Sequence, residues 1–235
     1  MSQIKIFTFN LLQEHTMVAW TSGPSCLVVD PSFYSYRERT EFLSFLDSEG
    51  LTPEAVILTH GHIDHVGGVK FLQDRYGIPV HMDPRERLSL DNAFKMAGKL
   101  GLDTPDTSFS FNEVKEGEVL KIAGLELEVI STPGHSPGST CYLERKEKFI
   151  FTGDTLFAGT IGRTDLDMYG DYDLEMEGIC TKLMPLDSDT RIYPGHGDSS
   201  TIGRESTHNP FLEPFNLPEP DPDSDLEPIV IRPDL

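Results

Sequence analysis

Short apolar runs alternate with polar turns along most of the chain. Runs rich in Val, Ile and Phe that are bounded by Gly, Pro or Asp are typical of buried strands. We predict strands at 5–9, 17–21, 26–30, 55–58, 80–82, 125–130, 140–143, 148–151 and 191–193. Some of these strands follow one another directly, whereas longer segments separate the others.

Five of the longer segments have the spacing or length of helices. In the first of them, Phe42, Phe45 and Leu46 recur at helical intervals. Gly50 and Gly77 follow the first two segments as stop signals. The predicted helices span 36–49, 65–76, 84–100, 172–183 and 201–204. Strands that are partly paired and partly separated by helices favour two facing sheets with helices outside, an α+β arrangement.

The end of the chain departs from this pattern. Residues 213–235 contain seven acidic residues, one basic residue and six prolines. Such a segment has little apolar surface to bury and cannot form a continuous helix. We therefore predict a folded body over 1–212 and an acidic, Pro-rich tail over 213–235. The apolar residues 229–231 either dock on the body or a second subunit, or stay unstructured with the rest.

Composition narrows the function. A chain of 235 residues can bury a sizeable core. Its formal charge of −20 repels phosphate backbones, which argues against a nucleic-acid partner. The sequence begins with a strand-like run rather than a signal peptide, and no stretch reaches the roughly 20 apolar residues of a membrane span. Three cysteines without metal spacing indicate reduced thiols, so we expect a cytoplasmic protein with no membrane contact.

One segment carries most of the candidate chemistry. His60, His62, Asp64 and His65 lie within six residues, directly after a predicted buried strand. Imidazole nitrogens and carboxylates are ligands that zinc prefers. Four such residues exceed what one tetrahedral ion takes from so short a segment. His60 and His62 can face one side of an extended turn, and Asp64 and His65 the other, which predicts two metals sharing this loop.

Three more candidate ligands follow strands in the same way. His135 lies in a Gly- and Pro-rich turn, Asp154 follows a glycine, and His196 stands between two glycines. A carboxylate at the position of Asp154 can bridge two metals. The repeated order of strand, turn and ligand favours one shared metal site over four unrelated loops. His15, His81 and His208 lack this context, and we interpret them as surface or structural histidines.

These segments resemble the metallo-β-lactamase superfamily, and within it the glyoxalase II-like hydrolases. The matching segments are 59–65 (THGHIDH), 132–138 (TPGHSPG), 151–157 (FTGDTLF) and 194–197 (PGHG). Segments 161–165 (IGRTD) and 207–212 (THNPFL) are similar to its short, single-domain bacterial branch. The resemblance runs from about residue 5 to residue 212. It implies a four-layer αββα sandwich and a metallo-β-lactamase-like hydrolase domain over 1–212.

The resemblance also implies a ligand set and a reaction. His60, His62 and His135 would hold the first of two divalent metals, His65 and His196 with Asp64 the second, and Asp154 would bridge them. Zinc is the expected metal, with iron or manganese as alternatives. A hydroxide between the metals would cleave a thioester such as S-D-lactoylglutathione, with Asp64 as the catalytic residue that orients it or carries its proton. Asp30 and Thr155 are the predicted partners of the ligand histidines.

The substrate is less well defined by the sequence. Glyoxalase II enzymes with two domains carry basic side chains for glutathione in a helical C-terminal domain, whereas only Arg204 and Arg232 follow His196 here. Arg163 would contact a substrate carboxylate or form an ion pair with Asp165 or Asp167, and we favour the ion pair. The expected partner is a small-molecule thioester, and the expected assembly a monomer or small homo-oligomer.

Two other functions stay open. A persulfide dioxygenase of the same superfamily would hold one iron with His60, His135 and Asp154, and its resemblance to this chain lies in 162–165 (GRTD). Segment 194–197 (PGHG) instead resembles the hydrolases. The other alternative is a non-catalytic interaction protein that kept the fold. The complete ligand set argues against it.

Overall fold

Two six-stranded sheets form the centre of the molecule in a computed structural model that describes residues 1–166 and 169–215. The predicted tail falls almost entirely on residues 216–235, which lie outside the described residues. The first sheet has the order β1 (Gln3–Phe9), β2 (Glu14–Trp20), β3 (Ser25–Val29), β4 (Thr52–Ile57), β5 (Val80–Met82), β6 (Asn112–Glu113). Its strands are antiparallel up to β3 and parallel from there on.

The second sheet is mainly antiparallel. Its order is β14 (Ser200–Thr201), β13 (Arg191–Pro194), β10 (Phe149–Gly153), β9 (Thr140–Glu144), β8 (Leu125–Ser131), β7 (Val119–Ile122). Strands β10 and β13 pair in parallel, and every other neighbouring pair is antiparallel. A small hairpin of β11 (Leu156–Phe157) and β12 (Thr160–Ile161) follows β10.

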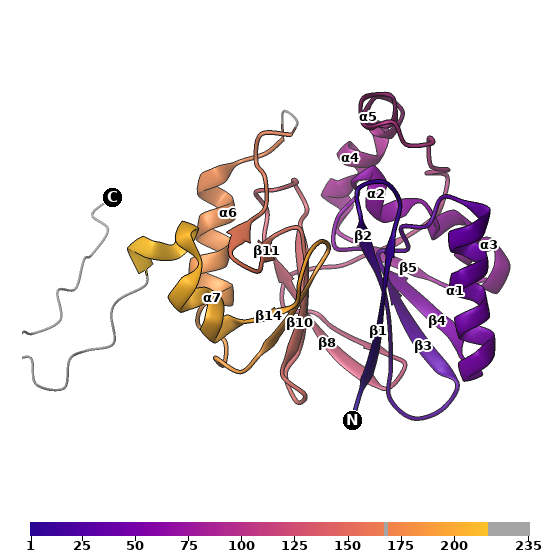
Figure 1. Cartoon of the computed structure of the whole chain (residues 1–235), viewed down its shortest axis with the longest axis horizontal. Coiled ribbons are helices and arrows are strands. Elements are labelled where there is room, and N and C mark those ends of the chain that lie inside the picture. The colour runs from indigo at the N-terminus through magenta and orange to yellow at the C-terminus, as the bar shows by residue number, and fades with distance from the viewer. Residues whose placement is uncertain (167–168, 216–235) are drawn as a thin grey trace, which may run out of the picture.

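Helices cover the outer faces of both sheets (Figure 1). Helices α1 (Tyr36–Glu49) and α3 (Val69–Tyr76) pack on the first sheet, and α6 (Tyr172–Gly178), the π-helical turn Ile179–Leu183 and α7 (Ile202–His208) on the second. The other described helices are α2 (Ile63–Val66), α4 (Arg87–Asp91), α5 (Ala93–Leu100) and the 3-10 turns Pro84–Glu86 and Pro210–Phe215. The predicted αββα sandwich of α+β class is confirmed.

Strand periodicity explains why the first sheet is apolar on both faces. Successive side chains of β3 point in opposite directions, so Val28 packs toward the helices while Leu27 and Val29 face the second sheet. Phe149 and Phe151 of β10 reach the same layer from the other side. The buried layer between the sheets therefore fixes the relative position of the strand ends that carry the candidate ligands.

Two of the predicted helices are interrupted. The segment 65–76 divides into α2 and α3 at Gly67 and Gly68 because aromatic rings from the loop after β3 pack against that backbone. A Cβ atom would lie 2.5 Å from the Tyr34 ring at Gly67, and 2.4 Å from the Phe33 ring at Gly68. The segment 84–100 is likewise a 3-10 turn and two short helices that meet at Asn92.

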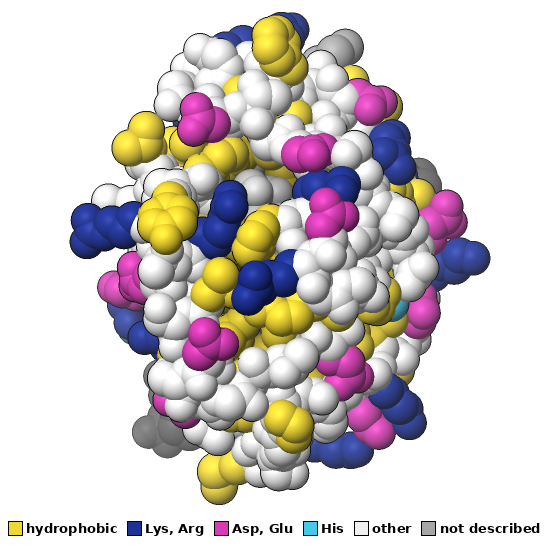
Figure 2. All heavy atoms as spheres, turned by 90° about the vertical axis from the view of Figure 1, so that its right-hand side faces the viewer, with side chains coloured by type: hydrophobic (Ala, Val, Ile, Leu, Met, Phe, Trp, Pro, Cys, Tyr) yellow, Lys and Arg dark blue, Asp and Glu magenta, His cyan; other side chains and the backbone are white. Residues whose placement is uncertain are grey.

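The surface shows how the negative charge is distributed. Figure 2 views the side of α1 and α3, where acidic and basic side chains alternate and hydrophobic ones are scattered between them. The net charge is thus not gathered into one acidic patch on this face. Within the described ranges, no helix combines the length and apolar character needed to cross a bilayer.

Candidate metal centre

The candidate ligands lie in the segments that follow four strands of the two sheets, most of them in loops and Asp64 and His65 in α2. His60, His62 and His65 come after β4 of the first sheet, and His135, Asp154 and His196 after β8, β10 and β13 of the second. A main-chain hydrogen bond of 2.9 Å from Thr140 N to Thr59 O ties β9 to the first of these loops. The packing of the sheets therefore brings residues distant in sequence together.

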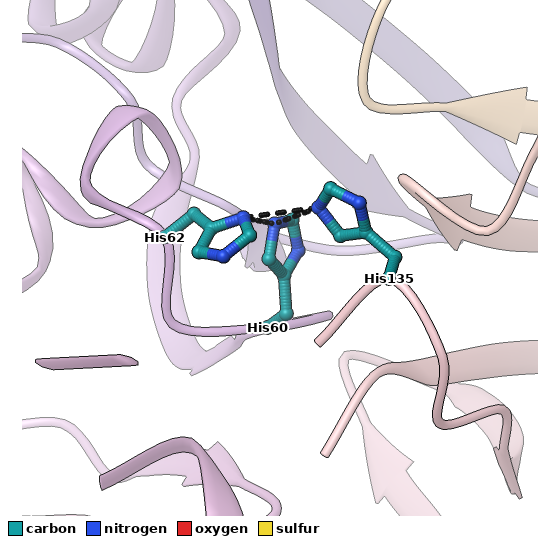
Figure 3. Close-up of side chains that lie close together, drawn as sticks. All are labelled: His60, His62 and His135. Carbon is teal, nitrogen blue, oxygen red and sulfur yellow. Dashed lines mark hydrogen bonds between the residues drawn. The ribbon is translucent and has the colours of Figure 1, made fainter. Parts of the chain in front are cut away.

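Three imidazoles form the first group. His60 Nε2 lies 3.1 Å from His62 Nδ1, and His135 Nε2 lies 3.2 Å and 3.0 Å from these two atoms (Figure 3). Nitrogens bound to one tetrahedral zinc at about 2.0–2.1 Å are about 3.3–3.4 Å apart. The spacing of the three ring nitrogens therefore fits one ion between them.

The second group contains Glu14, His65, Asp154 and His196, whose ligand atoms lie within 4.8 Å of one another. Asp154 Oδ1 is 3.5 Å from His65 Nε2, and Asp154 Oδ2 is 3.5 Å from His196 Nε2 and 3.6 Å from His135 Nε2. The carboxylate of Asp154 thus lies between the two groups. His65 Nε2 and Asp154 Oδ1 are buried without a hydrogen-bond partner among the described residues, as expected of atoms that bind an ion.

Asp64 borders the second group, to which Glu14 belongs. Asp64 Oδ2 lies 3.4 Å from His196 Nε2 and 3.9 Å from His65 Nε2. Glu14, which the sequence analysis did not select, is fully buried, and its oxygens lie 3.1 Å from His65 Nδ1 and 3.0 Å from His196 Nε2. No local sequence signal identified it, because Glu14 lies outside the predicted strand 17–21 and the burial of β2 along its whole length is apparent only in the structure.

Main-chain carbonyls orient two of the ligand histidines. His135 Nδ1 lies 2.8 Å from the carbonyl oxygen of Arg163, and His196 Nδ1 lies 3.3 Å from that of Gln13. A carbonyl oxygen only accepts, so Nδ1 donates its proton in both rings. The Nε2 lone pair of each ring is then directed into the site, which is the tautomer that a metal requires.

Hydrogen bonds to Asp30 connect the two groups of ligands. Its carboxylate accepts hydrogen bonds from His65 Nδ1 at 3.1 Å, from Thr59 N at 2.8 Å and from Thr59 Oγ1 at 2.6 Å. Thr59 Oγ1 donates to Asp30 and so accepts from His60 Nδ1 at 3.1 Å. Asp30 therefore orients one histidine directly and one through Thr59. Thr155, the other predicted partner, contacts Thr132 rather than a ligand histidine.

A second buried carboxylate joins the loops of the first group. Glu86 accepts from Gly61 N at 2.7 Å, from Gly138 N at 2.6 Å and from Ser136 Oγ at 2.7 Å. The first donor belongs to the loop of His60, and the other two follow His135. Glu86 itself lies in the 3-10 turn before α4, so this turn fixes the distance between the two loops.

Burial and charge separate the protonation states of the histidines in the metal-free protein. Burial lowers the pKa of His135 to about 4 and holds the pKa of His60 well below its ordinary value. Burial also opposes charge on His65, but nearby carboxylates, first of all Glu14, outweigh it and hold its pKa well above the ordinary value. The pKa of His196 is likewise raised against burial, to about 11, by Asp64 and Glu14.

These shifts predict that the second metal binds more tightly as the pH rises. His65 and His196 are charged at neutral pH and must each lose a proton to bind an ion, whereas His60 and His135 are already neutral. Between about pH 6 and 8.5, we expect the affinity of the second group for zinc to rise about tenfold per pH unit for each proton displaced. Stepwise zinc titration at several pH values measures this. Equal pH dependence of both binding steps would contradict it.

Arg163 lies at the rim of the site. Its guanidinium pairs with Asp165, with Nε–Oδ1 at 2.9 Å and Nη2–Oδ2 at 3.1 Å, and its side chain is 67% exposed. The predicted ion pair with a neighbouring aspartate is therefore present. Asp167, the other residue considered, lies outside the described residues. Arg163 acts on the site through its main-chain oxygen, which holds His135.

Three imidazoles in one group, and imidazoles with carboxylates in the other, are joined by Asp154 at one end of an αββα sandwich, and this arrangement is typical of a metal-dependent hydrolase. The chain belongs to the metallo-beta-lactamase superfamily, whose family model matches residues 10–196.

Individual relatives agree with this assignment. The hydroxyacylglutathione hydrolase GloC of Haemophilus influenzae is 34% identical over 213 residues, which cover 89% of this chain and 97% of that protein. The crystal structure of the BLEG-1 B3 metallo-beta-lactamase is similar with a TM-score of 0.81 and 35% identity, covering 89% of this chain and 99% of that one. TTHA1623, crystallised in a di-iron-bound form, has a TM-score of 0.79 and 32% identity, covering 88% and 100%.

Proposed function

We propose that this protein is a thioesterase that uses two metal ions, with hydroxyacylglutathione thioesters such as S-D-lactoylglutathione as the first substrates to test. The observation that carries the proposal is the carboxylate of Asp154 between two complete ligand groups, beneath an open cleft that reaches His62, Asp64 and His196. The activity named for the relative from Haemophilus influenzae supports the choice of substrate.

The proposed reaction divides between the ions and the protein. His60, His62 and His135 would hold one ion, and Glu14 or Asp64 with His65 and His196 the other; when bound, such ions activate water and polarise a carbonyl group. Asp30 and Glu86 would fix the positions of these ligand side chains through their hydrogen bonds to the ligand loops. Asp64, at the border of the second group and on the cleft, is placed to accept a proton from the attacking water.

The leaving group explains why a thioester suits this site. A thiol has an unperturbed pKa of about 8.5, so a thiolate leaves without a strong general acid, whereas an alkoxide needs a proton. The described residues that line the cleft include no lysine, tyrosine or cysteine to serve as a separate general acid, so a proton for the leaving group would have to come from a residue of the metal site such as Asp64. We propose further that the partner is this small molecule alone, and that the protein acts as a monomer or a small homo-oligomer.

The decisive experiment combines metal analysis with three activity assays. Protein loaded with zinc, and separately with iron or manganese, is tested for S-D-lactoylglutathione cleavage, for hydrolysis of a chromogenic β-lactam and for oxygen uptake with glutathione persulfide. We expect two metals per chain and thioester cleavage. One iron per chain with oxygen consumption would identify a persulfide dioxygenase instead. β-Lactam hydrolysis without thioester cleavage would also overturn the proposal.

A further inference from the structure

A cleft of about 630 Å³ lies over both ligand groups. Its floor is formed by His62, Asp64, His135, Asp154 and His196. A volume of this size accommodates a molecule considerably larger than a lactoyl group. The side chains that line the walls of the cleft therefore influence which thioester the protein accepts.

The walls are mainly apolar. Met96 and Leu100 of α5 stand on one side, Leu12 comes from the turn between β1 and β2, and Phe157 and Ile161 come from the β11–β12 hairpin. These residues belong to segments far apart in the sequence, so the apolar lining is formed by the fold rather than by one exposed helix face. A methylene group buried against such walls adds about fourfold to affinity.

The cleft offers little to a carboxylate. Among its described lining residues other than histidines, Arg163 is the only cationic one, and its guanidinium is already paired with Asp165. Asp198 adds a negative charge to the same lining. The hydroxyl of Ser89 is buried at the wall and has no hydrogen-bond partner in the described part of the chain, which leaves it for an uncharged polar group. The pairing of Arg163 and the presence of Asp198 both disfavour a thiol with two carboxylates.

We propose that the cleft selects thioesters whose acyl and thiol parts are both uncharged near the reacting bond, with an apolar acyl chain of several carbons against Met96 and Leu100. This inference rests on the proposed thioesterase function and narrows its substrate class. It makes S-D-lactoylglutathione a substrate with a high KM, because its two carboxylates enter an acidic molecule whose described cleft walls offer no unpaired lysine or arginine.

Binding and hydrolysis test the inference and the function separately. Binding is measured by calorimetry on metal-loaded protein with two thioethers that share a hexyl arm, the neutral S-hexyl-N-acetylcysteamine and S-hexylglutathione. We expect the neutral thioether to bind at least about tenfold more tightly. Equal or tighter binding of S-hexylglutathione would overturn the substrate class, whatever the hydrolysis assays show.

Hydrolysis is compared for hexanoyl- and acetyl-N-acetylcysteamine and for S-D-lactoylglutathione. The kcat/KM for the hexanoyl thioester should exceed the other two by at least about tenfold. If the glutathione thioester is cleaved best, the function stands and the inference fails. If no thioester is cleaved by protein carrying both metals, the proposed function fails, and the binding comparison still decides what the cleft prefers.

Two matched variants locate the effect on α5. Leu100→Glu places a charge in the cleft, whereas Phe94→Glu makes the same kind of change at a residue of the same helix that is 79% exposed and does not line the cleft. We expect Leu100→Glu to raise KM for the hexanoyl thioester at least about tenfold with kcat within about twofold. Phe94→Glu should leave both unchanged. Equal effects of the two variants would rule out an apolar subsite at Leu100.

Discussion

Replacing Asp154 with alanine is expected to lower kcat by more than about 100-fold and to release at least one metal. Residues that merely support a metal ligand typically contribute about 10–100-fold, and Asp154 lies between both groups. Burial raises the pKa of its carboxyl group, but the neighbouring histidines, first of all His65, outweigh this effect and hold the pKa well below the ordinary value. Metal content by mass spectrometry and steady-state kinetics measure the two effects.

The matched control is Asp189→Ala. This residue is 65% exposed and pairs with Lys148; it precedes β13, whereas His196 follows that strand, so the substitution removes the same group without touching the site. Its kcat and metal content should equal those of the unaltered protein. An Asp154→Ala protein that keeps two metals and full activity would show that the carboxylate is not shared between the groups.

Asp30→Asn should weaken metal binding in both groups by about 10–100-fold while leaving the fold intact. The carboxylate faces three donors, His65 Nδ1, Thr59 N and Thr59 Oγ1. An amide has the same shape, but its NH2 group would have to face at least one of these donors. His65 and, through Thr59, His60 would then lose the orientation that directs their lone pairs into the site.

Chelator competition with zinc measures the affinity of each binding step for this variant. Asp47→Asn, at an exposed position of α1, is the control that carries the same substitution outside the site. Weakening of one step alone would mean that the link through Thr59 contributes nothing. Unchanged affinity in both steps would remove Asp30 from the set of positioning residues.

The placement of the candidate ligands was predictable because strand periodicity and turn residues are local signals. A ligand that follows a buried strand and a glycine lies at a strand end, whatever the rest of the fold does. Glu14 carries no such local signal. It reaches the second group because the turn between β1 and β2 lies beside the loop after β13, where His15 N donates to Gly195 O at 2.7 Å.

The interruptions of the predicted helices could not be predicted from the sequence either, because they also involve contacts between segments that are distant in the chain. Gly67 and Gly68 end a helical segment because the rings of Tyr34 and Phe33 approach their backbone, and those rings belong to a different loop. Glu86 falls within the predicted helix 84–100 as an ordinary charged residue, yet it is fully buried and its hydrogen bonds join two ligand loops. Such roles depend on contacts between distant segments, which periodicity does not report.

The ligand loops belong to different sheets, and this has a consequence for folding. His60, His62 and His65 follow the first sheet, whereas His135, Asp154 and His196 follow the second. An ion held by both sets of ligands connects the two sheets. Metal binding and the packing of the sheets against each other must therefore stabilise each other reciprocally. Substitutions in the buried layer between the sheets, for instance at Leu27 or Phe151, would then first weaken metal binding, although neither residue is a ligand.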